Sequence, residues 1–343
     1  MKDKTSIIAL QNKLLSWYDK HGRKTLPWRN LGKNKNELDF DERLSGINRA
    51  YGVYISEIML QQTQVSRVLR DFYFPFLEKF PNLKTLARAD ESELLKAWQG
   101  LGYYSRARNL KLCALQCEAE FKGVLPRKKD ELLRLKGIGS YTAGAIACFA
   151  YDEAVSFVDG NIKRVLSRIF KLEQANLKEL GNLAELILNK NNAFDHNQAL
   201  LDLGALICVP KIPKCGLCPL YELCEGKFQP LNYAKSKKTE YEKLNLNALF
   251  ITYEDKIVLE KSKTKLYKGL YNPILTQTKP INALFIGSFK HSYTKYKLEI
   301  KVYVQRLKNK EDYEFIALKE LELLPLSNLC SKALKLFNQA RFS

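Results

Sequence analysis

The stretch LLRLKGIGSYTAGAIACFA, residues 132–150, has the pattern of two short apolar helices that turn on Gly137-Ile138-Gly139. Glycines at such a turn leave backbone N–H groups accessible at the start of the second helix, where the helix dipole also favours an anion. The turn therefore suits a phosphate grip that does not depend on base sequence. Many helix pairs that bind no phosphate also turn on glycine, so this stretch alone leaves both interpretations open.

An acidic residue follows about twenty residues later. The segment AVSFVDGNIKRVLSRIF, residues 154–170, places Asp159 after an apolar run and before a basic amphipathic helix. An aspartate in this position caps a helix N-terminus. It also suits a carboxylate held near DNA and kept ionised by the helix dipole and by backbone donors. The two roles are compatible.

Four cysteines lie close together in CVPKIPKCGLCPLYELC, residues 208–224. They are Cys208, Cys215, Cys218 and Cys224, separated by six, two and five residues. A four-cysteine zinc site and a cubane iron–sulfur cluster are both candidates. Zinc ribbons usually pair two short cysteine loops that are far apart in sequence. One continuous segment therefore favours the cluster. The other cysteines (Cys113, Cys117, Cys148 and Cys330) are interpreted as core or surface thiols.

The net charge points to a polyanionic partner. The 343 residues carry 56 Lys and Arg against 37 Asp and Glu, a formal charge of +19. Residues 226–343 alone hold 22 basic and 11 acidic side chains, so the shorter C-terminal part carries +11. Nucleic acid is the usual partner of such a surface. We expect a cytoplasmic protein with reduced thiols, because no signal peptide or membrane span is recognisable.

The hydrophobic pattern changes along the chain. Helical spacing covers residues 6–19, a long helix interrupted near Pro75 covers 53–80, and a further helix covers 105–121. Residues 31–48 are polar and aperiodic, which indicates a loop. Residues 247–262 and 296–307 alternate as strands do, and 326–340 reads as a closing helix. The predicted architecture is an all-α part followed by a small α+β domain.

The hairpin, the aspartate and the cysteine spacing together resemble the helix-hairpin-helix DNA glycosylases of the endonuclease III superfamily. Within it, LPWR (26–29), SEIMLQQTQV (56–65), WQGLGYYSRARNL (98–110), VDGNIKRVLSR (158–168) and DLGALIC (202–208) resemble the adenine DNA glycosylases, the MutY family. The resemblance covers nearly the whole chain. It implies a multidomain fold: an all-α helix-hairpin-helix glycosylase core with an iron–sulfur cluster subdomain, plus a C-terminal α+β Nudix-like domain.

The resemblance also implies domain boundaries. A discontinuous iron–sulfur cluster domain is expected from 1–48 and 151–225, and a six-helix barrel with the hairpin from 49–150. A connector is expected at 226–244, and a Nudix-like domain that recognises 8-oxoguanine at 245–343. This domain has no run that supplies the Nudix glutamates for magnesium, so we expect it to recognise and not to hydrolyse.

The family removes adenine mispaired with 8-oxoguanine, and the resemblance assigns catalytic roles. Glu57 falls at the general acid, and desolvation on an apolar helix would raise its pKa. Asp159 would stabilise the oxocarbenium ion, and Asn161 would orient this aspartate and the water. Tyr141 stands where relatives that also cut the strand carry a nucleophilic lysine. We therefore expect a monofunctional glycosylase with at most weak lyase activity, in which Tyr141 bonds to Asp159 or packs beneath it. Lys163 is expected to contact DNA and to form only adventitious adducts.

The remaining expectations concern DNA and cofactor. The partner is duplex DNA with adenine opposite 8-oxoguanine or guanine, bound by a monomer that carries a [4Fe-4S] cluster on the four cysteines. Gln62 and Tyr103 match residues that wedge into the duplex during base extrusion, although Tyr103 also suits ordinary helix packing. The family's Phe-Ser-His recognition loop aligns with Tyr293, Thr294 and Lys295, where Lys295 replaces the histidine and suits a phosphate contact instead.

Two other functions remain open from the sequence. An endonuclease III-like glycosylase and lyase would act on oxidised pyrimidines, but Tyr141 and the basic C-terminal part argue against it. A non-enzymatic iron–sulfur DNA-binding protein would bind DNA without base release.

Overall fold

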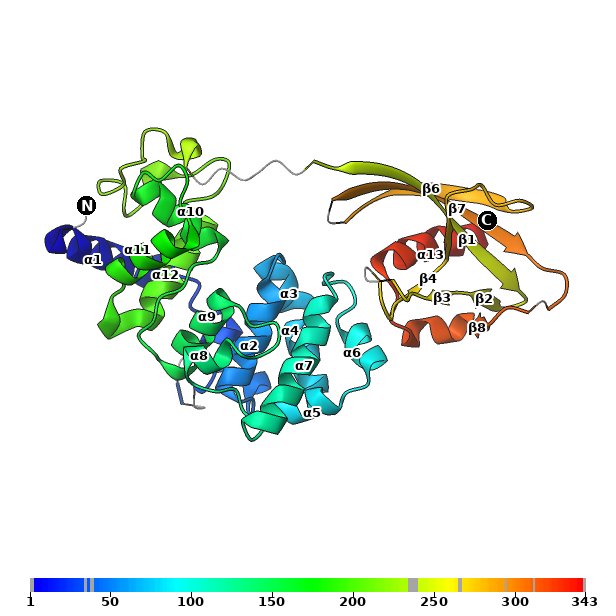
Figure 1. Cartoon of the computed structure of the whole chain (residues 1–343), viewed down its shortest axis with the longest axis horizontal. Helices are drawn as coiled ribbons and strands as arrows, with labels where there is room; N and C mark the ends of the chain where they lie inside the picture. The colour runs from blue at the N-terminus through cyan, green and yellow to red at the C-terminus, as the bar shows by residue number, and fades with distance from the viewer. Residues whose placement is uncertain are drawn as a thin grey trace. The chain divides into compact units, whose positions relative to one another are not determined.

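The computed structural model describes residues 3–33, 36–37, 40–233, 240–264, 267–293, 295–310 and 312–341 (Figure 1). Its contacts divide the chain into two compact units. The first comprises residues 1–87 and 112–237, and the second comprises residues 88–111 and 238–343. The domain boundaries expected from the sequence stay predictions. No helix in the described ranges is long and apolar enough to span a membrane.

The first unit is built from helices. Its α-helices are α1 Lys4–His21, α2 Arg49–Leu60, α3 Val65–Asp71, α4 Tyr73–Lys79, α5 Leu83–Arg88, α8 Lys129–Leu132, α9 Ser140–Tyr151, α10 Gly160–Ile169, α11 Leu177–Ile187 and α12 Ala193–Leu206. Helix α7 Ser105–Glu120 begins in the second unit and ends in the first. Short 3₁₀ turns are η1 Pro27–Arg29, η2 Glu42–Leu44, η3 Lys190–Asn192, η4 Cys215–Leu217 and η5 Pro230–Asn232.

Helix α9 is the central helix of this unit. Every residue from Thr142 to Ala150 is buried, as expected of a helix that is apolar around its whole circumference. It packs against α2, which is buried from Ala50 to Met59. At Gly144 an added Cβ would lie 2.7 Å from the Cβ of Phe157, so only glycine allows this close approach. The packing fixes the side chains at the end of α2 and the start of α9 relative to each other.

The predicted interruption near Pro75 is confirmed, because the helix breaks at Phe72, between α3 and α4. Pro75 lies in the first turn of α4, where a proline is tolerated because its missing N–H would have no intrahelical partner. The segment 53–80 also has an earlier break, after α2 and between Gln61 and Gln64, which was not predicted. The first break carries Gln62, whose φ is +59°, so the chain reverses there without a proline.

The second unit contains the sheet and α13 Asn328–Arg341. Its elements are α6 Glu91–Ala97, β1 Glu242–Tyr253, β2 Lys256–Val258, β3 Glu260–Lys261, β4 Tyr271–Asn272, β5 Ile274–Thr276, β6 Leu284–Tyr293, β7 Tyr296–Arg306, β8 Phe315–Ala317 and η6 Leu318–Leu323. The main sheet has the order β6-β7-β1-β2-β8, with β5 also paired to β1. Strands β1 and β7 are parallel, and β6 and β7 form an antiparallel hairpin.

The core of this unit lies between one face of the sheet and α13. Buried Phe250 and Ile300 from the strands pack with Leu329 and Phe337 from the helix, and the rings of Phe250 and Phe337 lie 5.3 Å apart. The predicted strands at 247–262 and 296–307 and the closing helix are confirmed. The long strand β6 was not predicted, because Gly287 and several polar residues interrupt its alternation.

Residues 88–111 join the second unit through polar contacts at the start of α13. The backbone N–H of Leu326 donates to Oε1 of Gln99 at 3.2 Å, and Nε2 of Gln99 donates to Ser331 Oγ at 3.4 Å. The Tyr104 hydroxyl donates to the carbonyl of Leu326 at 3.5 Å. These side chains anchor the segment to the same end of the helix.

Candidate active site

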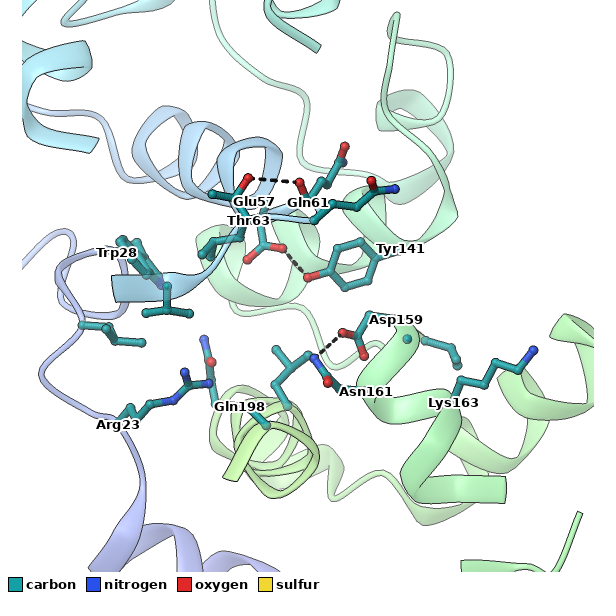
Figure 2. A pocket seen from close by; sticks show the side chains of 18 of the residues that line it. Arg23, Trp28, Glu57, Gln61, Thr63, Tyr141, Asp159, Asn161, Lys163 and Gln198 are labelled. Carbon is teal, nitrogen blue, oxygen red and sulfur yellow. Dashed lines mark hydrogen bonds between the residues drawn. The ribbon is translucent and has the colours of Figure 1, made fainter. Parts of the chain in front are cut away.

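A cavity of about 710 Å³ opens in the first unit. Six of the residues predicted from the sequence line it: Glu57, Gln62, Tyr141, Asp159, Asn161 and Lys163. They come from α2, the turn after it, α9 and α10, which are far apart in sequence (Figure 2). The fold therefore gathers the predicted catalytic side chains around one space.

Glu57 reaches the cavity from the last turns of α2. Its side chain is almost completely buried, with 5% of its surface exposed. The pKa of Glu57 is raised to about 7: burial is the largest cause and the nearby Asp159 adds to it, while the hydrogen bond from Tyr141 and the charge of Arg29 oppose them. A carboxyl group in this state exchanges a proton near neutral pH, as a general acid requires.

Tyr141 lies one residue into α9 and contacts Glu57. Its hydroxyl donates to Oε2 of Glu57 at 2.5 Å (Figure 2), and its ring meets that of Phe157 edge-on at 5.5 Å. The sequence predicted a hydrogen bond from Tyr141 to Asp159 or packing beneath it; in the structure the Tyr141 hydroxyl bonds to Glu57. Because α9 packs directly on α2, the hydroxyl reaches the glutamate instead. Burial raises the pKa of Tyr141 well above its usual value, so the phenol stays neutral.

Asp159 is the N-cap of α10. Its Oδ1 accepts the backbone N–H of Ile162 at 2.6 Å, and its Oδ2 accepts Nδ2 of Asn161 at 2.9 Å. Burial nevertheless raises the pKa of Asp159, with these donors acting in the opposite direction. The helix dipole and backbone donors were expected to keep this carboxyl ionised, and that expectation left out the burial that opposes them. The bonds fix the carboxylate at the cavity wall and leave Lys163 exposed beside it.

A buried ion cluster supports the cavity. Asp202, with no exposed surface, accepts hydrogen bonds from Arg29 at 2.8 and 2.9 Å and from Arg23 at 2.6 and 2.9 Å. Burial alone would raise the pKa of Asp202, but the two guanidinium groups outweigh it and hold the pKa below its usual value. Sequence reasoning quoted the motifs LPWR and DLGALIC that contain Arg29 and Asp202, but assigned them no role. Gln198, which also lines the cavity, was missed altogether.

The turn predicted to bind phosphate, Gly137-Ile138-Gly139, is accessible. Gly137 has a φ of +80°, which favours glycine. Gly139 is the N-cap of α9, and an added Cβ there would meet nothing within 4 Å. Ile138 between them is buried and anchors the turn. Open backbone at a helix N-terminus is what the phosphate interpretation requires.

The four predicted cysteines line one small cavity with apolar walls. Burial raises the pKa of Cys218 to about 12 and that of Cys224 to about 11. Nη1 of the buried Arg168 donates to Sγ of Cys208 at 3.3 Å, and the carbonyl of Arg168 accepts from Sγ of Cys224 at 3.4 Å. Among the described residues, no three metal-binding side chains converge tightly enough for a single ion.

Arg164 connects the cysteine segment to the carboxylate. Its Nε donates to the carbonyl of Cys208 at 2.6 Å, and its Nη2 donates to Oδ1 of Asn161 at 2.8 Å. Asn161 in turn donates to Asp159. A hydrogen-bonded chain thus runs from the first cysteine to the cavity, and nothing in the sequence reasoning had assigned Arg164.

The predicted wedge residues have unusual backbones. Gln62 has a φ of +59° and lines the cavity of the first unit. Tyr103, in the second unit, has a φ of +48° and is 50% exposed. Positive φ is uncommon in residues other than glycine and concentrates at functional positions. Half of the Tyr103 surface is exposed, so part of its side chain is accessible to a ligand.

The predicted recognition loop joins β6 to β7. Tyr293 stacks with Tyr267 and Tyr296, at 5.9 and 5.5 Å between ring centres. Lys295 is exposed, and its Nζ contacts Oε1 of Glu242 at 2.5 Å. Thr294 lies outside the described residues. The sequence reasoning missed His291, whose Nε2 lies 3.2 Å from the Tyr267 hydroxyl.

Comparison with known proteins gives a family. Residues 55–189 match the HhH-GPD superfamily of base excision DNA repair proteins. An adenine DNA glycosylase of Buchnera aphidicola is 37% identical over 310 residues, which is 84% of this chain and 83% of the relative. The Mus musculus adenine DNA glycosylase is 41% identical over 230 residues, or 65% of this chain, but only 43% of that longer protein.

Solved structures agree on the fold. A thermostable thymine-DNA glycosylase has a TM-score of 0.57 and 28% identity, covering 66% of this chain and 98% of that one. A trapped endonuclease III–DNA covalent intermediate has a TM-score of 0.54 and 20% identity, covering 67% of this chain and 99% of that one, and supports the fold alone. The helical glycosylase core is confirmed. The chain therefore belongs to the adenine DNA glycosylase family.

Proposed function

We propose that this protein hydrolyses the N-glycosidic bond of adenine mispaired with 8-oxoguanine or guanine in duplex DNA, and so initiates base excision repair. The observation that carries the proposal is the pairing of Glu57, with a pKa of about 7, and Asp159 around one cavity. Two carboxyl groups of different environment are what acid-assisted cleavage of a sugar bond uses. The family assignment is consistent with this chemistry.

In this mechanism Glu57 donates its proton to the extruded adenine, because its buried carboxyl holds a proton at neutral pH more readily than an exposed one. Bond cleavage leaves positive charge on the sugar. Asp159, held by Ile162 and Asn161, is positioned to stabilise that charge. Asn161 then keeps this carboxylate oriented while water attacks.

We further propose that the strand stays intact. A Schiff-base lyase needs an unprotonated amine at the sugar. Tyr141 offers a neutral phenol that is engaged with Glu57. Lys163 lines the cavity but its side chain is exposed to solvent.

The cysteine segment fits a [4Fe-4S] cluster better than zinc. A tetrahedral Zn²⁺ draws four sulfurs onto one atom, whereas a cubane takes one thiolate at each corner and keeps them apart. Cys208, Cys215, Cys218 and Cys224 line one small cavity and come from one continuous segment, as in the cysteine runs that hold such clusters. The cluster would have a structural role and hold the end of the helical unit together. Nearby Lys211 and Lys214 would then face the phosphates.

Recognition of the base opposite adenine is assigned to the Nudix-like C-terminal domain. Its recognition loop contains Tyr293, Thr294 and Lys295. The exposed ammonium of Lys295 is bonded to Glu242, and exchange of this surface partner for DNA phosphate costs little. Gln62 and Tyr103 are proposed to fill the gap left by the extruded base. Gly137 and Gly139 are proposed to bind a phosphate of the DNA backbone.

A substrate panel tests the proposal. The purified chain is incubated with duplexes that contain adenine opposite 8-oxoguanine, adenine opposite guanine, or thymine glycol, and released bases are separated by chromatography. We expect free adenine from the first two duplexes. Release of thymine glycol with strand cleavage would instead support the endonuclease III-like function, and binding without any base release would support a non-enzymatic DNA-binding protein.

A further inference from the structure

A second cavity, of about 280 Å³, lies at one end of the sheet in the C-terminal unit. Ile286 of β6, Val304 of β7 and Phe337 of α13 form its apolar floor, and Asn282, Arg306 and Arg341 are among the residues that line it. The last turn of α13 forms one wall of the cavity, and the end pair of β6 and β7, Leu284 with Val304, forms another. The cavity is at the opposite end of β6 from the recognition loop at Tyr293.

The two guanidinium groups of this cavity have no acidic partner within the described ranges of the chain. Arg341 lies 5.9 Å from the ring of Phe337 and makes no ion pair there. Arg108 of the same unit, by contrast, is paired with Glu91 at 2.8 Å. Two unpaired cations beside an apolar floor attract a group that is negatively charged at one end and apolar at the other.

Exposed apolar side chains continue from the cavity along the chain. Ile281 is 82% exposed and Leu284 is 68% exposed. They lie on or beside β6, the edge strand of the sheet. Single exposed apolar residues are ordinary, but a cluster next to a cavity on a sheet edge is typical of a surface that is covered by a partner.

The edge offers only a short stretch for pairing. A bulge between Phe285 and Gly287 shifts the register of β6, and Gly287 has a φ of +146°. Bulges on edge strands limit the addition of further strands. A ligand on this edge is therefore anchored mainly by side chains in the cavity.

We propose that this cavity binds a short extended segment of a partner protein in which an aliphatic and an acidic side chain lie two positions apart. An aliphatic side chain enters the floor at Ile286, Val304 and Phe337, and a carboxylate bonds to Arg306 and Arg341. Side chains two apart in an extended segment lie on the same face, so the intervening position faces solvent. Nucleic acid is the less favoured ligand, because phosphate would leave the apolar floor and Leu284 exposed.

Fluorescence anisotropy on the full chain tests this inference. The probe is a labelled nine-residue peptide, Leu-Ser-Asp-Ser-Leu-Ser-Asp-Ser-Leu, which places Leu and Asp on one face of an extended chain, and the matched peptide has Lys in place of Asp. We expect binding of the Asp peptide only. Since a lost charge-assisted bond costs roughly tenfold in affinity, Arg306→Gln and Arg341→Gln should each weaken binding about tenfold, and Leu284→Ser should weaken it too.

The control is Lys308→Gln, which removes a positive charge just outside the cavity and should leave binding unchanged. Thermal melting of each variant checks that the fold is retained. We expect it to be retained, because Arg306, Arg341 and Leu284 are exposed. Equal binding of the Lys peptide, no binding of the Asp peptide, or insensitivity to both arginine variants would overturn the proposal. So would displacement of the Asp peptide by a single-stranded oligonucleotide that loses affinity in the same variants, which would make the cavity a nucleic-acid site.

Discussion

Replacement of Tyr141 by Phe tests how Glu57 is prepared as an acid. The phenol donates to Oε2 of Glu57, and this bond favours the carboxylate, opposing the burial that raises the pKa of Glu57 to about 7. A hydrogen bond to a charged group contributes about 1.5–3 kcal/mol. Since one pKa unit corresponds to about 1.4 kcal/mol, loss of the bond should raise the pKa of Glu57 by about one to two units.

The assay is the single-turnover rate of adenine release from a duplex with adenine opposite 8-oxoguanine, measured from pH 5 to 10. Because the protonated form of Glu57 is the acid, the rate falls as the pH rises through its pKa. In Tyr141→Phe this alkaline fall should move to higher pH by about one to two units. Tyr151→Phe is the matched control, since its hydroxyl bonds to the carbonyl of Leu125.

An alkaline fall that stays in place or moves to lower pH in Tyr141→Phe would refute the reasoning about this hydrogen bond. The same shift in Tyr151→Phe would show that loss of a buried phenol, and not of the bond to Glu57, is responsible.

Three further predictions concern stability and the cofactor. Asp202→Asn leaves the buried guanidinium of Arg29 and the partly exposed one of Arg23 without their carboxylate. It should lower the free energy of unfolding by about 3–5 kcal/mol in urea titrations, whereas the exposed Asp71→Asn should change little; equal effects would contradict the argument from the buried cluster. Burial lowers the pKa of His196 to about 4, and neither ring nitrogen has a partner in the described structure. Because the unfolded chain takes up this proton near pH 6.5 and the folded chain only near pH 4, stability should fall by about 2 kcal/mol from pH 7 to 5, and His196→Phe should lack this part of the fall. Cys215→Ser should lower the iron content and the broad visible absorbance near about 400 nm relative to Cys113→Ser; equal iron in both would exclude Cys215 as a ligand.

Local sequence pattern was sufficient for much of the fold. Glycine at 137 and 139, an aspartate before a helix and uniform apolar character from Thr142 to Ala150 are local properties, and each corresponds to what the structure contains. The edge strand β6 was missed because half of it faces solvent and Gly287 interrupts its alternation.

The partners of buried polar groups could not be predicted, because they depend on packing between distant segments. Tyr141 bonds to Glu57, 84 residues away, and Asp202 bonds to Arg29, 173 residues away. The chain from Cys208 through Arg164 to Asn161 likewise needs α10 and α12 in contact. Spacing along the sequence carries no information on which of several nearby acceptors a side chain reaches.

The central claim is that Glu57 and Asp159 together break the glycosidic bond of adenine and leave the strand intact. The most direct measurement follows one end-labelled duplex, with adenine opposite 8-oxoguanine, through a single turnover by the wild-type chain, Glu57→Gln and Asp159→Asn, and analyses each sample with and without hot alkali. The account predicts that only the wild-type chain forms product, and that its strand is cut only after alkali. Product from either variant at the wild-type rate, or a strand cut without alkali, would contradict it.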